Sequence, residues 1–154
     1  MTRRKRVLAI STRGGHWVEL RRLAPAFAGC DVTWCTTDPD YRAELAAEEG
    51  AFRAVPEANR WQRLRLLRQV VAVFWTLLRV RPDVVISTGS SPGLFAVLIG
   101  RRLFRARTIW VQSLADTEGM SMSGGLAGRH ADLWLTQWEH LARPEGPHYH
   151  GAIL

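Results

Sequence analysis

The chain has 154 residues and a mass of 17.4 kDa, which is the size of one domain and too short for two full ones. Hydrophobic residues make up 47% of it and charged residues 23%, a globular composition that excludes a disordered or fibrous protein. The net charge of +7 arises in three acid-free segments, residues 3–6, 60–81 and 101–107, which predict an anionic partner: phosphate, nucleic acid or an acidic membrane surface.

Short apolar strands alternate with helical patterns along the whole chain. Strands are expected at residues 7–10, 31–36, 51–55, 84–87, 108–111 and 131–136. Helices are expected at residues 18–27, 41–49 and 61–80, and from the turn at residues 88–93 to about residue 104. This alternation predicts a single α/β domain, Rossmann-like, with a parallel sheet and helices on both faces.

Two loops of this sheet are candidate ligand sites, because ligands of such folds bind at the carboxyl ends of strands. The first loop, residues 11–16, follows the first strand and opens a helix. Its glycines allow a close backbone approach, and the helix start offers free N–H groups and partial positive charge to a phosphate or diphosphate. The candidate residues are Ser11, Arg13, Gly14, Gly15 and His16, of which His16 is the titratable base. A plain tight turn is the alternative interpretation.

The second loop contains Gly89, Ser90 and Ser91, and it repeats the arrangement after the strand at residues 84–87. Its hydroxyl and N–H groups suit the same anion or a sugar. Taken alone, the serines are better explained as helix N-caps before Pro92. Two such loops at the ends of two strands are more informative than either one.

The helix at residues 60–81 has a distinctive charge layout. Residues 69–78 carry no charge and include Phe74 and Trp75, and six arginines and no acid flank them. Such a helix suits interfacial insertion against anionic lipid, with Arg63, Arg68, Phe74, Trp75 and Arg79 as the predicted membrane-binding residues. The alternative is an ordinary helix on one face of the sheet, whose arginines extend past its ends.

Targeting signals are not recognisable in the sequence. Cys30 and Cys35 match neither a redox nor a zinc motif, and reduced thiols fit the cytosol. No uninterrupted apolar stretch approaches the length of a spanning helix. The expected location is therefore the cytosol or a membrane face that borders it. His140, His148 and His150 are expected to be solvated, with no metal site.

Several segments, in chain order, resemble one enzyme family. Residues 11–16 (STRGGH), followed by Glu19 and Leu20, resemble the motif SxGGHxxxL. Residues 81–90 (RPDVVISTGS) resemble KPDVIISxGA, and residues 133–139 (LWLTQWE) resemble DxFIVQWxE. The apolar tail at residues 151–154 is similar as well. These are motifs of the acceptor-binding halves of split GT-B glycosyltransferases, which include bacterial exopolysaccharide subunits and the membrane subunit of the eukaryotic dolichyl-diphosphate N-acetylglucosaminyltransferase.

The resemblance implies the N-terminal half of a GT-B fold, without cofactor or metal. It implies a subunit at the cytoplasmic face of a membrane that binds a polyprenyl-diphosphate-linked saccharide, while a separate GT-B C-terminal-type chain binds the nucleotide-sugar. Gly14 and Gly15 would face the acceptor diphosphate, His16 would be the base, and Gly89, Ser90 and Ser91 would line the same cleft. Gln112 stands where relatives usually carry Glu and would contact substrate.

The resemblance implies a membrane contact and a contact with the partner chain, and the sequence offers a candidate segment for each. Membrane contact would come from the helix at residues 60–81, or through the partner, because the spanning helix of the eukaryotic members has no counterpart in this sequence. The segment at residues 137–154 is a candidate docking site for the partner. A stand-alone nucleotide-binding Rossmann-like protein is the alternative function, against which the missing GxGxxG motif counts. Nucleic-acid binding rests on charge alone.

Overall fold

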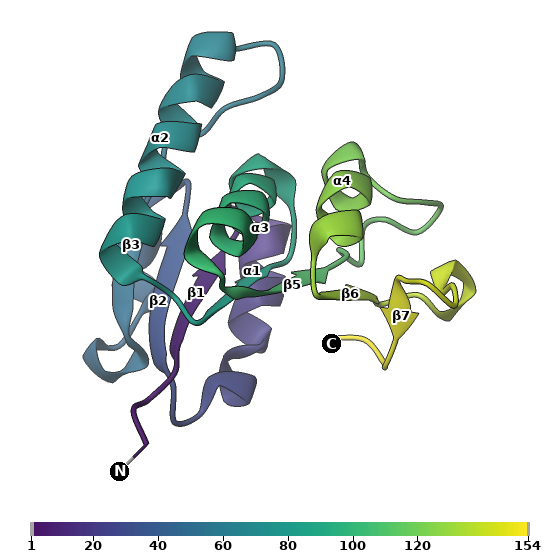
Figure 1. Cartoon of the computed structure of the whole chain (residues 1–154), viewed down its shortest axis with the longest axis horizontal. Coiled ribbons are helices and arrows are strands. Elements are labelled where there is room, and N and C mark those ends of the chain that lie inside the picture. Colours follow the sequence, from purple (N-terminus) through teal and green to yellow (C-terminus); the bar gives the residue numbers. More distant parts are fainter. Residues whose placement is uncertain (1, 154) are drawn as a thin grey trace.

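Seven parallel strands form one sheet in the order β3-β2-β1-β4-β5-β6-β7 (Figure 1). The computed structural model describes residues 2–153, so the predicted tail residue Leu154 lies outside it. The strands are β1 (Arg6–Ile10), β2 (Asp31–Thr36), β3 (Ala51–Ala54), β4 (Val84–Ser87), β5 (Arg107–Val111), β6 (Leu133–Thr136) and β7 (His148–Tyr149). The chain winds outward from β1 in one direction and from β4 in the other, so the strand order reverses between these two central strands.

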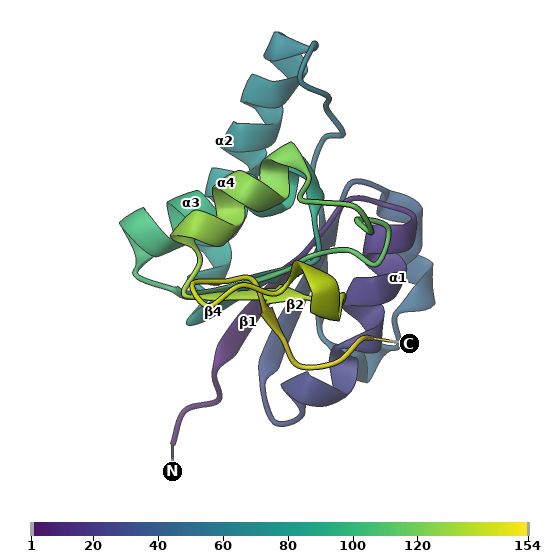
Figure 2. The same ribbon diagram turned by 90° about the vertical axis from the view of Figure 1, so that its right-hand side faces the viewer.

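Helices cover both faces of the sheet, which confirms the predicted fold class. The helices are α1 (Gly15–Arg22), α2 (Arg63–Val80), α3 (Ser90–Phe104) and α4 (Met122–His130). α2, α3 and α4 lie on one face and α1 on the other (Figures 1 and 2). Short 3-10 helices at Ala24–Phe27, Pro39–Glu44, Ala47–Glu49 and Glu139–Leu141 fill the connections.

The alternation of side chains along β1 explains why a core forms on each face. Leu8 and Ile10 pack among residues of α2, α3 and α4, whereas Val7 and Ala9 pack toward α1. All four are almost fully buried, as expected for a strand that is covered on both sides. Because β1 and β4 are enclosed on every side, the loops that follow them stand on a rigid base.

Two predicted helices differ from the structure, each for a local reason. The helix predicted at residues 18–27 ends at Arg22 and continues as a 3-10 turn, because Pro25 has no N–H to continue the ladder. The helix predicted at residues 41–49 is wrong: two 3-10 helices stand there, separated at the extended residue Leu45. This geometry lets Tyr41 stack on Trp17, with ring centroids 5.4 Å apart.

Candidate functional site

The two predicted loops meet at the carboxyl ends of β1 and β4. These strands are neighbours in the sheet, with Ile10 opposite Ser87. The hydroxyl of Thr12 donates to the hydroxyl of Ser90 at 2.9 Å. The hydroxyl of Thr88 donates to the carbonyl of His16 at 2.6 Å. Side chains of each loop therefore hold the other in place, and the two loops form one surface.

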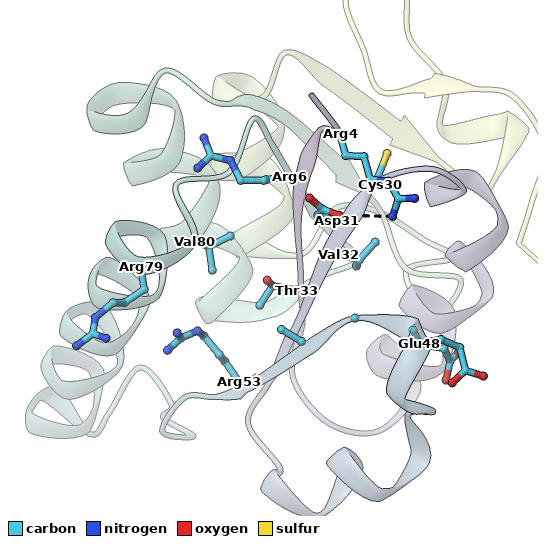
Figure 3. A pocket seen from close by; sticks show the side chains of 13 residues that line it. Arg4, Arg6, Cys30, Asp31, Val32, Thr33, Glu48, Arg53, Arg79 and Val80 are labelled. Carbon is cyan, nitrogen blue, oxygen red and sulfur yellow. Dashed lines mark ion pairs between the residues drawn. The ribbon is translucent and has the colours of Figure 1, made fainter. Parts of the chain in front are cut away.

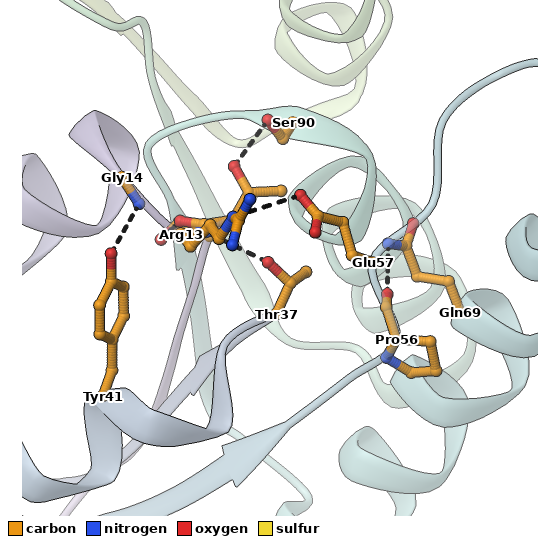
Figure 4. Close-up of polar contacts among 10 residues, drawn as sticks. Arg13, Gly14, Thr37, Tyr41, Pro56, Glu57, Gln69 and Ser90 are labelled. Carbon is orange, nitrogen blue, oxygen red and sulfur yellow. Dashed lines mark hydrogen bonds and ion pairs between the residues drawn. The ribbon is translucent and has the colours of Figure 1, made fainter.

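Gly14 and Gly15 shape the start of α1 on this surface. Gly14 has φ +84°, a conformation that favours glycine, and its N–H donates to the Tyr41 hydroxyl at 3.1 Å (Figure 4). The Arg13 N–H donates to the hydroxyl of Thr37 at 3.2 Å. A side-chain carbon added at Gly15 would meet no atom within 4 Å. The start of α1 at Gly14 and Gly15 is therefore open to solvent, as an anion site at a helix N-terminus requires.

The imidazole of His16 packs against the backbone of Gly89 in the second loop. A Cβ atom added at Gly89 would lie 2.5 Å from Cε1 and 2.6 Å from Nδ1 of His16. The Nδ1 atom is buried and has no hydrogen-bond partner within residues 2–153. Buried polar atoms are nearly always paired in proteins, so this unpaired nitrogen is an exception within the packing of the two loops.

The other predicted residues of the two loops divide into two groups. Arg13 is exposed and pairs with Glu57, with Nε and Oε1 3.7 Å apart, so it stands at the rim. By contrast, the hydroxyl of Ser11 donates to the carbonyl of Thr12, and that of Ser91 donates to the buried amide of Gln69 at 2.7 Å. The polar groups of Ser11 and Ser91 thus serve the scaffold.

Gln112 also has a structural role, in place of the predicted substrate contact. Its side chain is 1% exposed, and its Oε1 accepts from the indole of Trp110 at 3.0 Å. Its Nε2 donates to the carboxylate of Asp116 and to the hydroxyl of Ser121 at 3.3 Å. These bonds fix the loop after β5 and the start of α4, and they leave no amide atom for a substrate.

Glu19 is a central residue whose partners the sequence does not reveal. It lies one turn after His16 on α1, and it is only 7% exposed. Its carboxylate accepts from the Ser113 hydroxyl at 2.9 Å, the Leu114 N–H at 3.2 Å and the Gln137 amide at 3.1 Å. The helix that carries His16 is thereby joined to the segments that follow β5 and β6. Only its place three residues after His16 hinted at this role.

Gln137 extends this network to the end of the described chain. Its Oε1 accepts from the Ile153 N–H at 2.7 Å, and its Nε2 also donates to the carbonyl of Gln112 at 3.0 Å. The indole of the next residue, Trp138, donates to the carbonyl of Leu114 at 2.9 Å. A cavity of about 700 Å³ lies beside these residues, with Trp138 and Tyr149 in its lining.

An apolar stripe runs along the solvent face of α2, which projects past the rest of the molecule (Figure 2). Its exposed residues follow one another at spacings of three and four and are Leu64, Leu67, Val71 and Trp75; the exposed Trp61 lies in the turn just before the helix. Leu64 is 76% exposed and Trp75 53%. The predicted membrane residue Phe74 is instead half-buried and packs on Phe104, with ring centroids 6.0 Å apart. The exposed stripe therefore extends toward the start of α2, beyond the uncharged residues 69–78.

Arginines border this apolar stripe. Arg63, Arg68 and Arg79 are exposed, and the part of the chain that the structure describes gives them no ion-pair partner. The guanidinium of Arg60 lies over the ring of Trp61, 4.7 Å from its centroid. Among residues 2–153, none of the helices has both the length and the apolarity needed to cross a bilayer.

Relatives with related sequences identify the family. Residues 9–153 match the family described as oligosaccharide biosynthesis protein Alg14 like. The chain is 29% identical to a protein of Eremothecium gossypii named UDP-N-acetylglucosamine transferase subunit ALG14. That alignment of 180 residues spans 97% of this chain and 80% of the other protein.

Solved structures with the same fold are about twice as long as this chain. MurG of Acinetobacter baumannii superposes with a TM-score of 0.75 at 14% identity, over 96% of this chain and 45% of MurG. A UDP-N-acetylglucosamine 2-epimerase of Rickettsia bellii gives a TM-score of 0.73 at 14% identity, over 98% of this chain and 46% of the epimerase. The chain thus corresponds to one half of these folds, as the motifs predicted. Since the family match extends from residue 9 to residue 153, the chain belongs to the Alg14-like family of oligosaccharide biosynthesis proteins.

Proposed function

We propose that this chain is the acceptor-binding, membrane-associated subunit of a two-chain glycosyltransferase. The complex transfers a sugar from a nucleotide-sugar to a polyprenyl-diphosphate-linked saccharide during the synthesis of a lipid-linked oligosaccharide or a polysaccharide. Two facts support a split enzyme. The relative in E. gossypii is named a transferase subunit, and this chain spans less than half the length of MurG.

The convergence of the two loops carries the proposal. The open first turn of α1, after Gly14, is a binding site for the acceptor diphosphate, because its N–H groups and helix dipole favour negative charge. Arg13 at the rim adds a positive charge, and Ser90 lies across the β1–β4 boundary. An anion that is bound there lies beside the imidazole of His16.

His16 is the candidate base. In the proposed reaction the acceptor hydroxyl oxygen attacks the anomeric carbon of the donor sugar, and the bond from that carbon to the nucleoside diphosphate breaks. A ring nitrogen of His16 accepts the hydroxyl proton, and the partner chain holds the leaving diphosphate. The contact between the imidazole and Gly89, together with the bond from Thr88 to the His16 carbonyl, fixes the position of the base.

The apolar stripe on α2 is the proposed membrane contact. Exposed indole and leucine side chains gain free energy at a lipid interface, and arginines beside them attract anionic headgroups. The first turns of α2 project beyond the carboxyl ends of the strands (Figure 1). The loops at residues 11–16 and 88–93, called the glycine loops below, stand at the same end, so a lipid-linked acceptor reaches the site from there. The cavity beside Trp138 and Tyr149 is the proposed docking position for the donor-binding partner.

A test of the catalytic assignment uses the chain with its donor-binding partner and a lipid-linked acceptor. We expect no transfer by this chain alone. In the complex, His16→Gln should lower kcat by a factor of about 10²–10⁴, the usual contribution of a general base. His130→Gln, at the far end of α4, is the matched control and should retain the rate. Full-rate transfer by the isolated chain would refute the split-enzyme proposal.

A separate test addresses the membrane contact by vesicle flotation. The double substitution Leu64→Ser/Trp75→Ser removes two residues of the α2 stripe and should abolish flotation of the isolated chain. Leu103→Ser/Met122→Ser removes two equally exposed apolar residues from α3 and α4 and should leave flotation intact. Equal flotation of both variants would show that membrane attachment does not depend on α2.

A further inference from the structure

A second positively charged site lies at the opposite edge of the sheet from the glycine loops. A cavity of about 460 Å³ opens beside the amino ends of β1 and β2 and the last turn of α2 (Figure 3). Its lining includes Arg6 at the start of β1, Arg53 in β3 and Arg79 in α2. These three arginines, from three different elements, are called the arginine pocket below.

Alternation along the strands brings these arginines to one face. Arg6 has the same parity as Leu8, which packs toward α2 and α3. Arg53 lies opposite Cys35 in the register of β2 and β3, and Cys35 belongs to the same core. Arg79 lines the same cavity from the last turn of α2, where its exposed side chain lies at the outer rim (Figure 3).

Most carboxylates at the cavity are already engaged. Asp31 lies 3.9 Å from Arg4, which also lines the cavity (Figure 3). Glu49 pairs with Arg21 at 2.7 Å, on the other face of the sheet. Within residues 2–153, no ion pair reaches Arg53 or Arg79, and Glu48 is the one lining acid without an ion pair of its own.

Arg6 has one acidic neighbour, which it shares. Asp83 lies 3.7 Å from the Arg6 Nε, accepts from the Arg6 N–H at 2.8 Å and pairs with Arg3 at 2.8 Å. The Nε atom of Arg6 is buried and has no hydrogen-bond partner among the described residues. One carboxylate therefore serves two guanidinium groups.

The surrounding edge is basic as well, which strengthens the field at the cavity. In a parallel sheet all amino ends share one edge, so residues that precede β1, β4 and β5 gather there. Basic residues at these strand starts are Arg3, Arg4, Lys5, Arg81, Arg105 and Arg107. The basic segments at residues 3–6 and 101–107 thus converge at this edge. The proposed transferase reaction uses no residue of this edge.

We infer that the arginine pocket binds an anion that carries a phosphate or diphosphate group, at a site separate from the glycine loops. The guanidinium group suits this ligand because its planar N–H donors form paired, charge-assisted hydrogen bonds to phosphate oxygens. The hollow is large enough for a diphosphate. The inference does not depend on the transferase assignment, because no residue of the pocket belongs to the loop site.

Cys30, which precedes β2 and packs on the α1 side of the sheet, reports whether this cavity is filled in the full chain. It lines the same cavity and is half-buried, whereas Cys35 is fully buried and burial raises its pKa to about 12. Iodoacetamide reacts with thiolates, so in the native protein it should modify Cys30 alone. Inorganic pyrophosphate should slow this reaction as it fills the pocket. A diphosphate bound at the distant glycine loops would leave the rate unchanged.

Variants test whether the arginines hold the anion. Arg53→Gln and Arg79→Gln should each raise the pyrophosphate concentration for half-protection of Cys30 by about tenfold. Both side chains are exposed, so the variants should fold, which circular dichroism checks. Arg129→Gln, an equal charge change on α4, should leave protection unaltered.

Vesicles distinguish the source of the phosphate group. The vesicles are tested on the Leu64→Ser/Trp75→Ser variant, which lacks the proposed membrane contact of α2. Protection of its Cys30 by phosphatidylglycerol–phosphatidylcholine vesicles, beyond that by phosphatidylcholine alone, would identify a lipid headgroup as the ligand. Protection by pyrophosphate without this vesicle effect would identify a soluble phosphate compound. The inference is overturned if neither probe slows alkylation, or if the Arg53→Gln/Arg79→Gln double variant is protected as well as the wild type.

Discussion

Substitution of Gly15 by alanine should raise stability and lower activity. Gly15 is the first residue of α1, its φ lies outside the left-handed region, and an added Cβ would meet no atom within 4 Å. Alanine restricts the unfolded chain at such a position, which should stabilise the fold by about 0.4–1 kcal/mol. For a chain of this size the expected rise in Tm is about 1–4 °C.

The same methyl group should interfere with the acceptor. It would occupy open space at the first residue of α1, beside which the diphosphate is proposed to bind. Displacing an oxygen from one charge-assisted hydrogen bond removes about 1.5–3 kcal/mol, which corresponds to a fall in acceptor affinity of about tenfold or more. Stability and acceptor binding should therefore change in opposite directions.

The assay combines thermal unfolding with the KM for the lipid-linked acceptor in the reconstituted complex. Gly125→Ala is the matched control, because Gly125 is also helical and its added Cβ would also meet nothing within 4 Å. It should raise Tm without changing KM. If Gly15→Ala gained stability and kept the wild-type KM, the open turn of α1 would not be the diphosphate site.

Three further predictions concern the scaffold. Glu19→Gln should destabilise the fold by about 1–3 kcal/mol in urea unfolding, because an amide replaces a buried carboxylate oxygen that accepts hydrogen bonds; an unchanged midpoint would contradict this. The backbone N–H of Arg6, and then Arg3, lower the pKa of Asp83 below 3.8, so its stabilisation is present above pH 3.8 and is lost as pH falls through the lower, folded-state pKa. The urea midpoint of Asp83→Asn should accordingly converge with that of the wild type in acid, and a constant difference would exclude this linkage. Native protein should react with one equivalent of a thiol reagent, at Cys30, and with a second, at Cys35, only after unfolding.

The sheet was predictable because its signals are local. Six of the seven strands stand where the sequence predicted them, and the clearest apolar runs belong to the buried central strands β1 and β4. α4 escaped prediction because its sequence, MSGGLAGRH, is rich in glycine and serine and has no clear apolar period. β7 has only two residues and depends on pairing with β6.

The site was predictable only in part, because contacts between distant residues decide which polar groups remain free. Gly14, Gly15 and His16, which follow the first strand, indicated the first loop as a ligand site. The predicted parallel sheet indicated that the loop after the strand at residues 84–87 lies at the same edge. The local sequence does not distinguish Ser90 from Ser91. The hydroxyl of Ser90 accepts a hydrogen bond from Thr12 in the other loop, whereas the hydroxyl of Ser91 donates to Gln69. The enclosure of Gln112 likewise depends on Asp116 and Ser121, which its own strand does not reveal.

The bonds that join the two loops have a consequence for the newly made chain. Thr12 and Ser90 are 78 residues apart in sequence, and Thr88 and His16 are 72 apart. The glycine loop leaves the ribosome long before the loop that orders it, so a nascent first half contains the motif without the site. Contacts of such separation form late and only as the central strands pair. Acceptor binding should therefore emerge together with the cooperative fold, and a trapped folding intermediate with β1 but not β4 in place should have no affinity for the acceptor.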